Sequence, residues 1–251
     1  MITIIFGPPR AGKTALMVYM LNDVAFDYER NRNMRKFIEK KNLEKNWNVQ
    51  APIHCTSANF EITFRKQGYN PRYARVIDPN RLGFYNGNNN PHFIMPYETF
   101  GIMEAQGYYN SRNFANFPEW KSNLFEQHGH LHLDFVLDTQ RPGLIDVNIR
   151  ELSNFIEIRS FEVKEDIDGC FDRLEWVVRT FDCCGAVDEY MKSGKHDASL
   201  YTEKIIISER DIRKQYDSWS LAPKFYIGHE NKQYDIETSM QYLFDIKQGA
   251  A

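Results

Sequence analysis

The sequence predicts an α/β fold in which a mostly parallel sheet lies between two layers of helices. Three patterns predict it: an apolar run at the N-terminus, a helical repeat soon after it, and alternating segments in the last third of the chain. The run Ile2–Phe6 is short and rich in β-branched residues, which is typical of a central parallel strand buried on both faces. The composition suits a globular core, since 42% of the 251 residues are hydrophobic and 14% are aromatic.

The first part of the chain predicts alternating strands and helices. Lys13–Asn22 carries apolar residues at helical spacing. Residues 28–46 predict an exposed helix, because they hold seven Lys or Arg against three Glu. Further strands are expected at Ile53–Phe60, Phe100–Met103 and Leu133–Leu137, with a loop over residues 86–91.

After about residue 155 the pattern becomes β-rich. Phe155–Val163 and Leu174–Phe181 alternate like paired strands joined by a turn at residues 166–169. Tyr201–Ile207 predicts another strand, and Ser208–Gln215 a short helix with Ser208 as its N-cap. We therefore expect a core over residues 1–155 and a β-rich C-terminal extension over residues 156–251 that completes the same domain.

A glycine-containing loop stands between the first strand and the first helix. It matches the phosphate-loop pattern GxxxxGK[ST] in full, with the residues Gly7, Pro8, Pro9, Arg10, Ala11, Gly12, Lys13 and Thr14. Such a loop turns backbone N–H groups toward phosphates, and the helix after it presents its positive end. Lys13 would neutralise the β- and γ-phosphates, and the Thr14 hydroxyl would complete a Mg²⁺ shell. A chance glycine turn is the alternative, but the strand and helix on either side favour a P-loop NTPase that binds ATP or GTP.

Hydrolysis requires an acidic residue at the end of a neighbouring strand, to hold Mg²⁺ and to orient the attacking water. Two strands compete for this role. One ends in Glu104, with Met103 where a metal-side Asp would be expected. The other ends in Asp138 and is, by pattern alone, the better apolar run followed by an acid. A solvated strand end is the alternative for either carboxylate.

Short motifs in the middle of the chain resemble one known family. Residues 103–112 resemble the DEAQ…SR segment, and residues 128–140 the HRH.GLD…TQ strand, of the zonula occludens toxin-like family of filamentous-phage assembly ATPases. Asp146, Ile149 and Arg150 fall as in that family's ID..IR.L continuation, and residues 216–218 are similar to its YKS element. The order and spacing of these motifs carry the resemblance.

The resemblance implies a three-layer P-loop fold of the additional-strand type, similar to RecA and the DNA translocases. By position, Glu104 would be the catalytic glutamate and Gln140 a γ-phosphate sensor, with Lys13 as the third catalytic residue. Asp138 would then precede the sensor and lie away from the metal.

The resemblance also implies partners and a location. It implies a ring-shaped homo-oligomer that hydrolyses ATP at subunit boundaries, with phage coat or membrane assembly proteins as partners. The motor would drive virion extrusion or move single-stranded phage DNA, in the cytoplasm of a bacterial host or at the periphery of its inner membrane. No window approaches the roughly 18 apolar residues that a membrane span needs.

Two departures from the family pattern bear on activity. Met103 cannot bind Mg²⁺, which leaves Thr14 as the metal-binding side chain. Gly129 replaces the arginine of the HRH motif, so an arginine acting across a subunit boundary must come from Arg112, Arg141 or Arg150. Two rival functions therefore stay open: a P-loop kinase acting on a small molecule, and an ATP-binding assembly scaffold with little or no hydrolysis.

Three further groups of residues have competing interpretations. His128, His130 and His132 would share one face of a strand and suit zinc, although a polar loop or subunit interface is favoured. A basic run could contact DNA or form a solvated helix face; it comprises Arg30, Arg32, Arg35, Lys36, Lys40, Lys41 and Lys45. Aromatic residues interleaved with arginines could stack on bases, although packing is favoured; they are Tyr69, Tyr73, Phe84 and Tyr85, with Arg72, Arg75 and Arg81.

Overall fold

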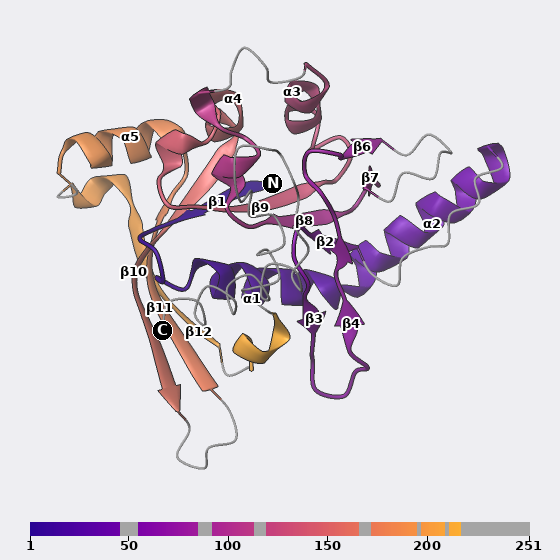
Figure 1. The fold of residues 1–251 in the computed structure, drawn as a ribbon, viewed down its shortest axis with the longest axis horizontal. Coiled ribbons are helices and arrows are strands. Elements are labelled where there is room, and N and C mark those ends of the chain that lie inside the picture. The colour runs from indigo at the N-terminus through magenta and orange to yellow at the C-terminus, as the bar shows by residue number, and fades with distance from the viewer. Residues whose placement is uncertain are drawn as a thin grey trace, which may run out of the picture. The chain divides into compact units, whose positions relative to one another are not determined.

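An eight-stranded sheet organises the chain, in the order β12-β11-β10-β1-β9-β8-β2-β5 (Figure 1). The computed structural model describes residues 1–45, 55–84, 92–112, 119–165, 172–194, 197–208 and 211–216, all within the unit Met1–Tyr216. The strands of the sheet are β1 (Ile2–Phe6), β2 (Thr56–Ala58), β5 (Arg75–Val76), β8 (Thr99–Ile102), β9 (Asp134–Thr139), β10 (Ser153–Glu165), β11 (Asp172–Phe181) and β12 (Thr202–Ser208). Two small two-stranded sheets pair β3 (Thr63–Phe64) with β4 (Arg72–Tyr73), and β6 (Gly83–Phe84) with β7 (Phe93–Ile94).

The pairing confirms the expected fold class. β1 runs parallel to both β9 and β10, and β8 runs parallel to β9 and β2. β9 is thus inserted between the strand before the phosphate loop and β8, the strand that leads to Glu104, which is the additional-strand arrangement. β10, β11 and β12 are antiparallel and form the β-rich side of the sheet. The division at residue 155 stays a prediction; β10 runs across that position.

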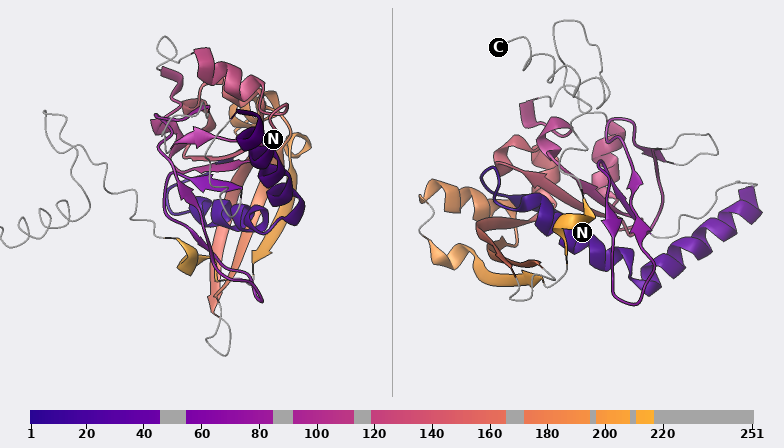
Figure 2. Two further views of the ribbon diagram at one scale, coloured as in Figure 1. Left: turned by 90° about the vertical axis from the view of Figure 1, so that its right-hand side faces the viewer. Right: turned by 60° about the horizontal axis from the view of Figure 1, so that its bottom comes forward.

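Helices cover both faces of the sheet, which gives three layers (Figures 1 and 2). Alternate residues of β1 pack into one hydrophobic cluster with side chains of α3 (Glu119–Glu126), α4 (Val147–Glu151) and α5 (Cys184–Lys192). α1 (Lys13–Ala25) packs on the other face, so closely that a side chain at Gly101 of β8 would collide with Leu21. The remaining helical segments are α2 (Tyr28–Lys45), η1 (Ala105–Gly107), η3 (Pro142–Leu144), η4 (Ala198–Leu200) and η5 (Arg213–Gln215).

Two predicted elements differ from the structure in its described residues. Ser208 is the last residue of β12 and pairs with Leu174, so strand pairing with β11 continues through it. After it, helical structure among the described residues is limited to the single 3₁₀ turn η5. Of the strand expected over Ile53–Phe60, the described residues contain β2. Asn59, the residue directly after it, bonds the backbone of Met103 through its side chain at 2.8 and 3.0 Å. The expected loop 86–91 and turn 166–169 lie outside the described residues.

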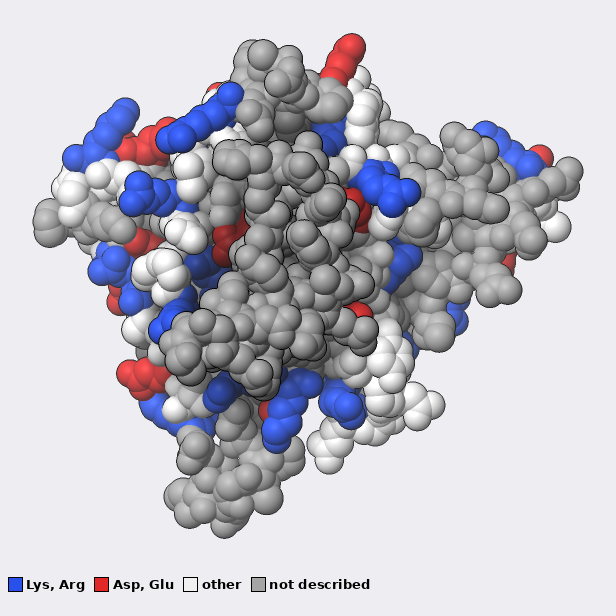
Figure 3. Space-filling model, in the orientation of Figure 1, with Lys and Arg blue, Asp and Glu red and all other residues white. Residues whose placement is uncertain are grey.

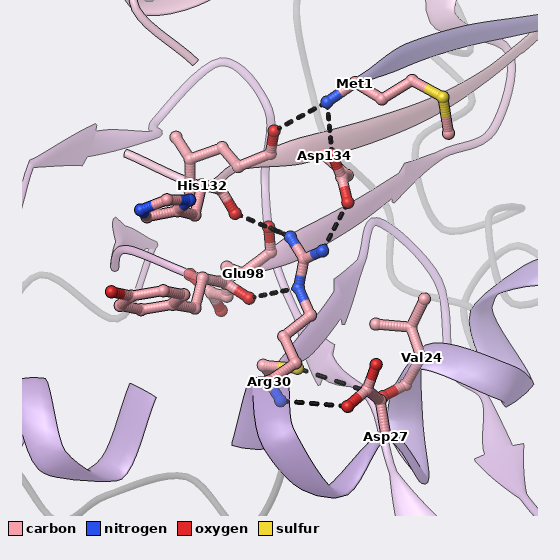
Figure 4. A network of polar contacts seen from close by, with 10 residues as sticks. Met1, Val24, Asp27, Arg30, Glu98, His132 and Asp134 are labelled. Atoms are coloured by element: carbon pink, nitrogen blue, oxygen red, sulfur yellow. Dashed lines mark hydrogen bonds and ion pairs between the residues drawn. The ribbon is translucent and has the colours of Figure 1, made fainter. Parts of the chain in front are cut away.

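Arg30, the first arginine of the basic run, anchors α2 to the edge of the sheet (Figure 4). Its guanidinium donates to the Tyr97 carbonyl at 2.7 Å, the His132 carbonyl at 2.7 Å and the Asp134 carboxylate at 2.5 Å. Asp134 also pairs with the N-terminal amine of Met1. Because its donors bond within the fold, Arg30 has a structural role, and DNA contact by the basic run stays a prediction.

Two other features bear on the predictions. His128, His130 and His132 lie in a turn before β9 and not in a strand, and His132 stacks on Tyr97 with ring centroids 4.7 Å apart. Within the described residues no helix is long and apolar enough to cross a membrane.

Candidate active site

The phosphate loop depends on its two glycines. Gly7 follows β1 directly with φ 155°, and a Cβ atom there would lie 3.3 Å from the carbonyl oxygen of Ile158. Gly12 has φ 78°, and a Cβ atom there would lie 2.6 Å from the ring of Phe161. Side chains at either position would therefore be strained in both backbone and packing. α1 begins at the next residue, so its N-terminal amides face the loop.

The Lys13 side chain lies within the curve of the loop. Its ammonium donates to the carbonyl oxygens of Gly7 at 3.2 Å and Pro8 at 3.0 Å, and the residue is buried. Pro8, Pro9 and Arg10 are exposed around it, with Arg10 in the left-handed region at φ 63°. The loop thus brings a cation and the start of a helix to one place, which is the arrangement that binds phosphates.

Asp138 reaches the hydroxyl of Thr14, which corrects the expectation that it lies away from the metal side. Its Oδ2 atom lies 3.2 Å from Thr14 Oγ1, and its Oδ1 atom accepts a hydrogen bond of 2.6 Å from the Glu104 amide. The strand register explains this position. Ile5 of β1 pairs with Asp138 of β9, so the acid is level with a residue two positions before Gly7, on the strand next to β1.

Burial changes the acidity of Asp138. The residue is 1% exposed, and burial raises the pKa of its carboxyl group to about 6, although the Glu104 amide and the Lys13 ammonium act in the opposite direction. The carboxylate form therefore predominates at neutral pH and offers oxygen ligands inside the protein.

The Met103 side chain contacts the same Thr14 hydroxyl as Asp138. Its sulfur also lies 3.2 Å from Thr14 Oγ1, and Ile102 pairs with Leu137, so Met103 and Asp138 are level in adjacent strands. A thioether is a poor ligand for Mg²⁺, which prefers oxygen. The Thr14 hydroxyl and the Asp138 carboxylate are hard oxygen donors that fit Mg²⁺, which takes few protein ligands and uses water and phosphate oxygens for the rest. Within the described residues no cluster of three or more His, Cys, Asp or Glu could hold a metal by itself.

Glu104 and Gln140 lie at the same edge of the sheet as the loop. Glu104 follows β8, is exposed and has φ 52°; its carboxylate accepts a hydrogen bond from Gln106. Gln140 is exposed and follows Thr139, which pairs with Phe6, the residue before Gly7. Both side chains thus end neighbouring strands beside the phosphate loop and face solvent.

The three candidate arginines have different surroundings. Arg150 is partly buried and pairs with Asp188 at 3.3 Å, so its guanidinium is engaged within the chain. Arg112 and Arg141 are exposed, and their segments lie together through the bridge between Asn110 and Ile145.

Two aromatic residues of the β-rich side support the phosphate loop, and the sequence analysis missed them. The indole N–H of Trp176, on β11, donates to the Gly12 carbonyl at 3.2 Å. Phe161, on β10, stacks on Trp176 with ring centroids 5.5 Å apart and fills the space beside Gly12. The sequence signal was alternation alone, which shows that these residues share a sheet face but not what that face contacts.

A glycine loop after a central parallel strand, a Lys-Thr pair at the start of the next helix and an inserted strand define a P-loop NTPase fold. The structure is similar to the N-terminal domain of zonular occludens toxin from Neisseria meningitidis, with 17% sequence identity, a TM-score of 0.50 and coverage of 86% of this chain and 98% of that one. The resemblance seen in residues 103–112 and 128–140 is thus confirmed at the level of the fold.

A second solved structure is the genome packaging NTPase B204 of Sulfolobus turreted icosahedral virus 2, which was solved in complex with ATP-gammaS. It has 12% identity, a TM-score of 0.38, and coverage of 81% of this chain and 95% of that one, a likeness too distant to add to the first. No model of a known protein family and no curated protein sequence matches the chain.

Proposed function

We propose that the chain binds ATP at the phosphate loop and hydrolyses it to drive the assembly or extrusion of a filamentous phage. The observation that carries the hydrolytic part is the 3.2 Å approach of the buried Asp138 carboxylate to the Thr14 hydroxyl. An oxygen pair at this place supplies the metal-binding function that Met103 lacks. The phage role follows from the motif resemblance together with the shared fold.

Each residue of the site has a distinct role in this proposal. The backbone N–H groups of Arg10, Ala11 and Gly12 and the Lys13 ammonium bind the phosphates, since Pro8 and Pro9 carry no N–H. Thr14 and Asp138 hold Mg²⁺, which neutralises phosphate charge when bound. Glu104, exposed at the end of β8, orients the attacking water and accepts its proton. Gln140, at the end of β9, senses the γ-phosphate.

The wider proposal is a ring of identical subunits with ATP at their boundaries. Arg112 and Arg141 are the arginines suited to reach a neighbouring subunit, because both are exposed and lie on adjoining segments. Single-stranded phage DNA and coat or membrane assembly proteins are the proposed partners, in the host cytoplasm or at the inner membrane.

A scaffold that binds ATP without turnover is the second candidate. Met103 favours it, because its sulfur lies 3.2 Å from Thr14 Oγ1, where a second oxygen ligand would strengthen the metal site.

Separate measurements of binding and turnover test the proposal. Calorimetry with ATP and with GTP, each with Mg²⁺, should show binding that Lys13→Ala abolishes and that Lys192→Ala, on the exposed end of α5, leaves unchanged. Phosphate release should accompany binding of ATP. Binding without release, in the assembled oligomer and with DNA present, would support the scaffold, and phosphate passed to a small acceptor would support the kinase. If no nucleotide binding is detected even at high nucleotide concentration, the hydrolase, the scaffold and the kinase are all refuted.

A further inference from the structure

A basic and aromatic hollow lies at the end of α1 that points away from the phosphate loop. It has a volume of about 420 Å³, and its lining includes Phe26, Tyr28, Arg32, Lys36, Tyr69 and Arg72. α1 has 13 residues and separates the hollow from the phosphate loop by about 20 Å at 1.5 Å per residue. The hollow is therefore a second site, distinct from the one that holds nucleotide in the proposed function.

The hollow joins two sequence features that stand about 35 residues apart and had separate interpretations. The basic run supplies Arg32, Arg35 and Lys36 from the exposed face of α2. The aromatic and arginine segment supplies Tyr69 and Arg72 from the loop before β4 and from β4 itself. Only the packing of α2 beside this segment makes them one surface.

Exposed aromatic rings form one wall of the hollow. Tyr28 is 74% exposed and Tyr69 is 57% exposed, so neither side chain is buried in the core. Phe26 supports Tyr69 edge-on with ring centroids 5.5 Å apart, and the Arg72 guanidinium lies 4.7 Å above the Phe26 ring. Arg72 is held in place by donating to the Ala25 carbonyl. The wall is therefore built by fixed residues and presents two rings to solvent.

The hollow is positively charged, although the chain as a whole carries a net negative charge. Four basic side chains, Arg32, Arg35, Lys36 and Arg72, line the hollow against one acid, Glu39, although the whole chain has a net charge of −3. On the face drawn in Figure 3, basic and acidic side chains are interspersed. Arg32 also meets Glu29 at 3.5 Å, an exposed pair that a stronger anion can replace.

We infer that this hollow binds single-stranded nucleic acid. Lys and Arg side chains attract the phosphates, and exposed tyrosine rings stack on unpaired bases, the combination that such sites use. A duplex keeps its bases stacked inside, so it would engage the cations and not the rings. An acidic protein segment would likewise engage the cations alone. The inference extends the DNA-handling part of the proposed function and does not depend on ATP binding.

Fluorescence anisotropy with a labelled oligo-dT, over a range of salt concentrations and without nucleotide, tests the inference on the full chain. The double variant Arg32→Gln, Lys36→Gln should weaken binding at low salt at least fivefold. It should also reduce the slope of log affinity against log salt by about 1.4, because two fewer phosphates of the single strand are neutralised and give up their counterions. The matched control is Lys192→Gln, Lys204→Gln, which removes two exposed charges on α5 and β12.

The tyrosine variants test base stacking separately from charge, because they remove a ring and no cation. Tyr28→Ser and Tyr69→Ser should each weaken oligo-dT binding on the order of 5- to 100-fold and leave the salt slope unchanged. Tyr73→Ser is the control, because Tyr73 is 68% exposed but does not line the hollow.

Four results would overturn the inference: no binding of oligo-dT by the unaltered chain, equal losses in the control variants, equal affinity for a duplex, or equal competition by a polyglutamate peptide. Lys13→Ala separates this site from the proposed ATP site, since it should abolish ATP binding and leave oligo-dT binding intact. Loss of ATP binding alone would then count against the proposed function and not against the hollow.

Discussion

The ends of β8 and β9 both carry an acidic residue beside the phosphate loop, but the two acids have opposite surroundings. Glu104, after β8, is exposed and sits in the left-handed region of backbone conformation. Asp138, within β9, is buried and faces Thr14. The comparison therefore supports the proposed division of roles, in which Glu104 orients water and Asp138 binds the metal.

In the proposed function, this difference would also compensate for Met103. The residue level with Asp138 on β8 cannot bind Mg²⁺, yet the neighbouring strand brings a carboxylate to the same hydroxyl. Such compensation is geometrically possible because parallel strands end at one edge of the sheet.

The largest expected effect is a loss of ATP turnover when Glu104 is replaced. Glu104→Gln should lower the rate of phosphate release by on the order of 10² to 10⁴, since the water loses its base, while ATP binding stays within twofold. Steady-state phosphate release and calorimetry measure the two quantities. Glu189→Gln, an exposed change on α5, is the matched control. Normal turnover in Glu104→Gln would move the role of base to Asp138.

The second prediction concerns the stability of the chain without Mg²⁺. The folded pKa of Asp138, about 6, lies above its ordinary value of 3.8, so its stabilising contribution is complete below pH 3.8 and is lost as pH rises through 6. At pH 8 the buried charge costs about 3 kcal/mol. Asp138→Asn should therefore increase the free energy of unfolding at pH 8 by up to about that amount, and give little gain at pH 4.

Urea unfolding at the two pH values measures this difference. Asp182→Asn, at an exposed position, should show no such dependence on pH. A loss of stability in Asp138→Asn at pH 8 would mean that the hydrogen bonds of the carboxylate outweigh its burial.

A smaller effect is expected in metal affinity. Asp138→Asn should weaken the binding of Mg²⁺ to the ATP complex by about 10- to 100-fold, because an amide replaces a carboxylate, and should leave metal-free ATP binding little changed. Titration of Mg²⁺ at fixed ATP measures this. Equal Mg²⁺ affinity in the variant would show that Thr14 and water suffice, and the assignment of the metal to Asp138 would fail.

The smallest predicted effect tests whether the β-rich side of the sheet contributes to the same site. Trp176→Phe keeps the ring but removes the N–H that donates to the Gly12 carbonyl, which should cost about 0.5 to 1.5 kcal/mol of stability. Thermal unfolding and ATP titration should show a lower melting temperature and a few-fold weaker affinity. Trp120→Phe, on α3, is the control. An unchanged melting temperature and affinity would show that the hydrogen bond to Gly12 is dispensable.

Local patterns predicted the elements that depend on neighbours in the chain. Ile2–Phe6, the phosphate loop and the helix after Lys13 follow from β-branched runs, glycine positions and helical spacing, and the structure contains each of them. The helix expected over Ser208–Gln215 differs from the structure, because Ser208 pairs with Leu174 in β12 and the described helical structure after it is the short turn η5. Met103 was recognised as a departure from the motif, and the strand pattern favoured Asp138 as the acid at the site. The family resemblance then placed Asp138 before the sensor and away from the metal, and strand register brings it to Thr14.

By itself the sequence determined that the chain has a phosphate loop, a parallel sheet and a β-rich second part, because these features depend on residues close together in the chain. Only the tertiary structure decided that Asp138 meets Thr14, that Trp176 supports Gly12, and that Arg32 and Tyr69 line one hollow. Each of these contacts joins residues that are far apart in sequence. Their distances depend on strand order and register, which are set by the packing of the whole sheet.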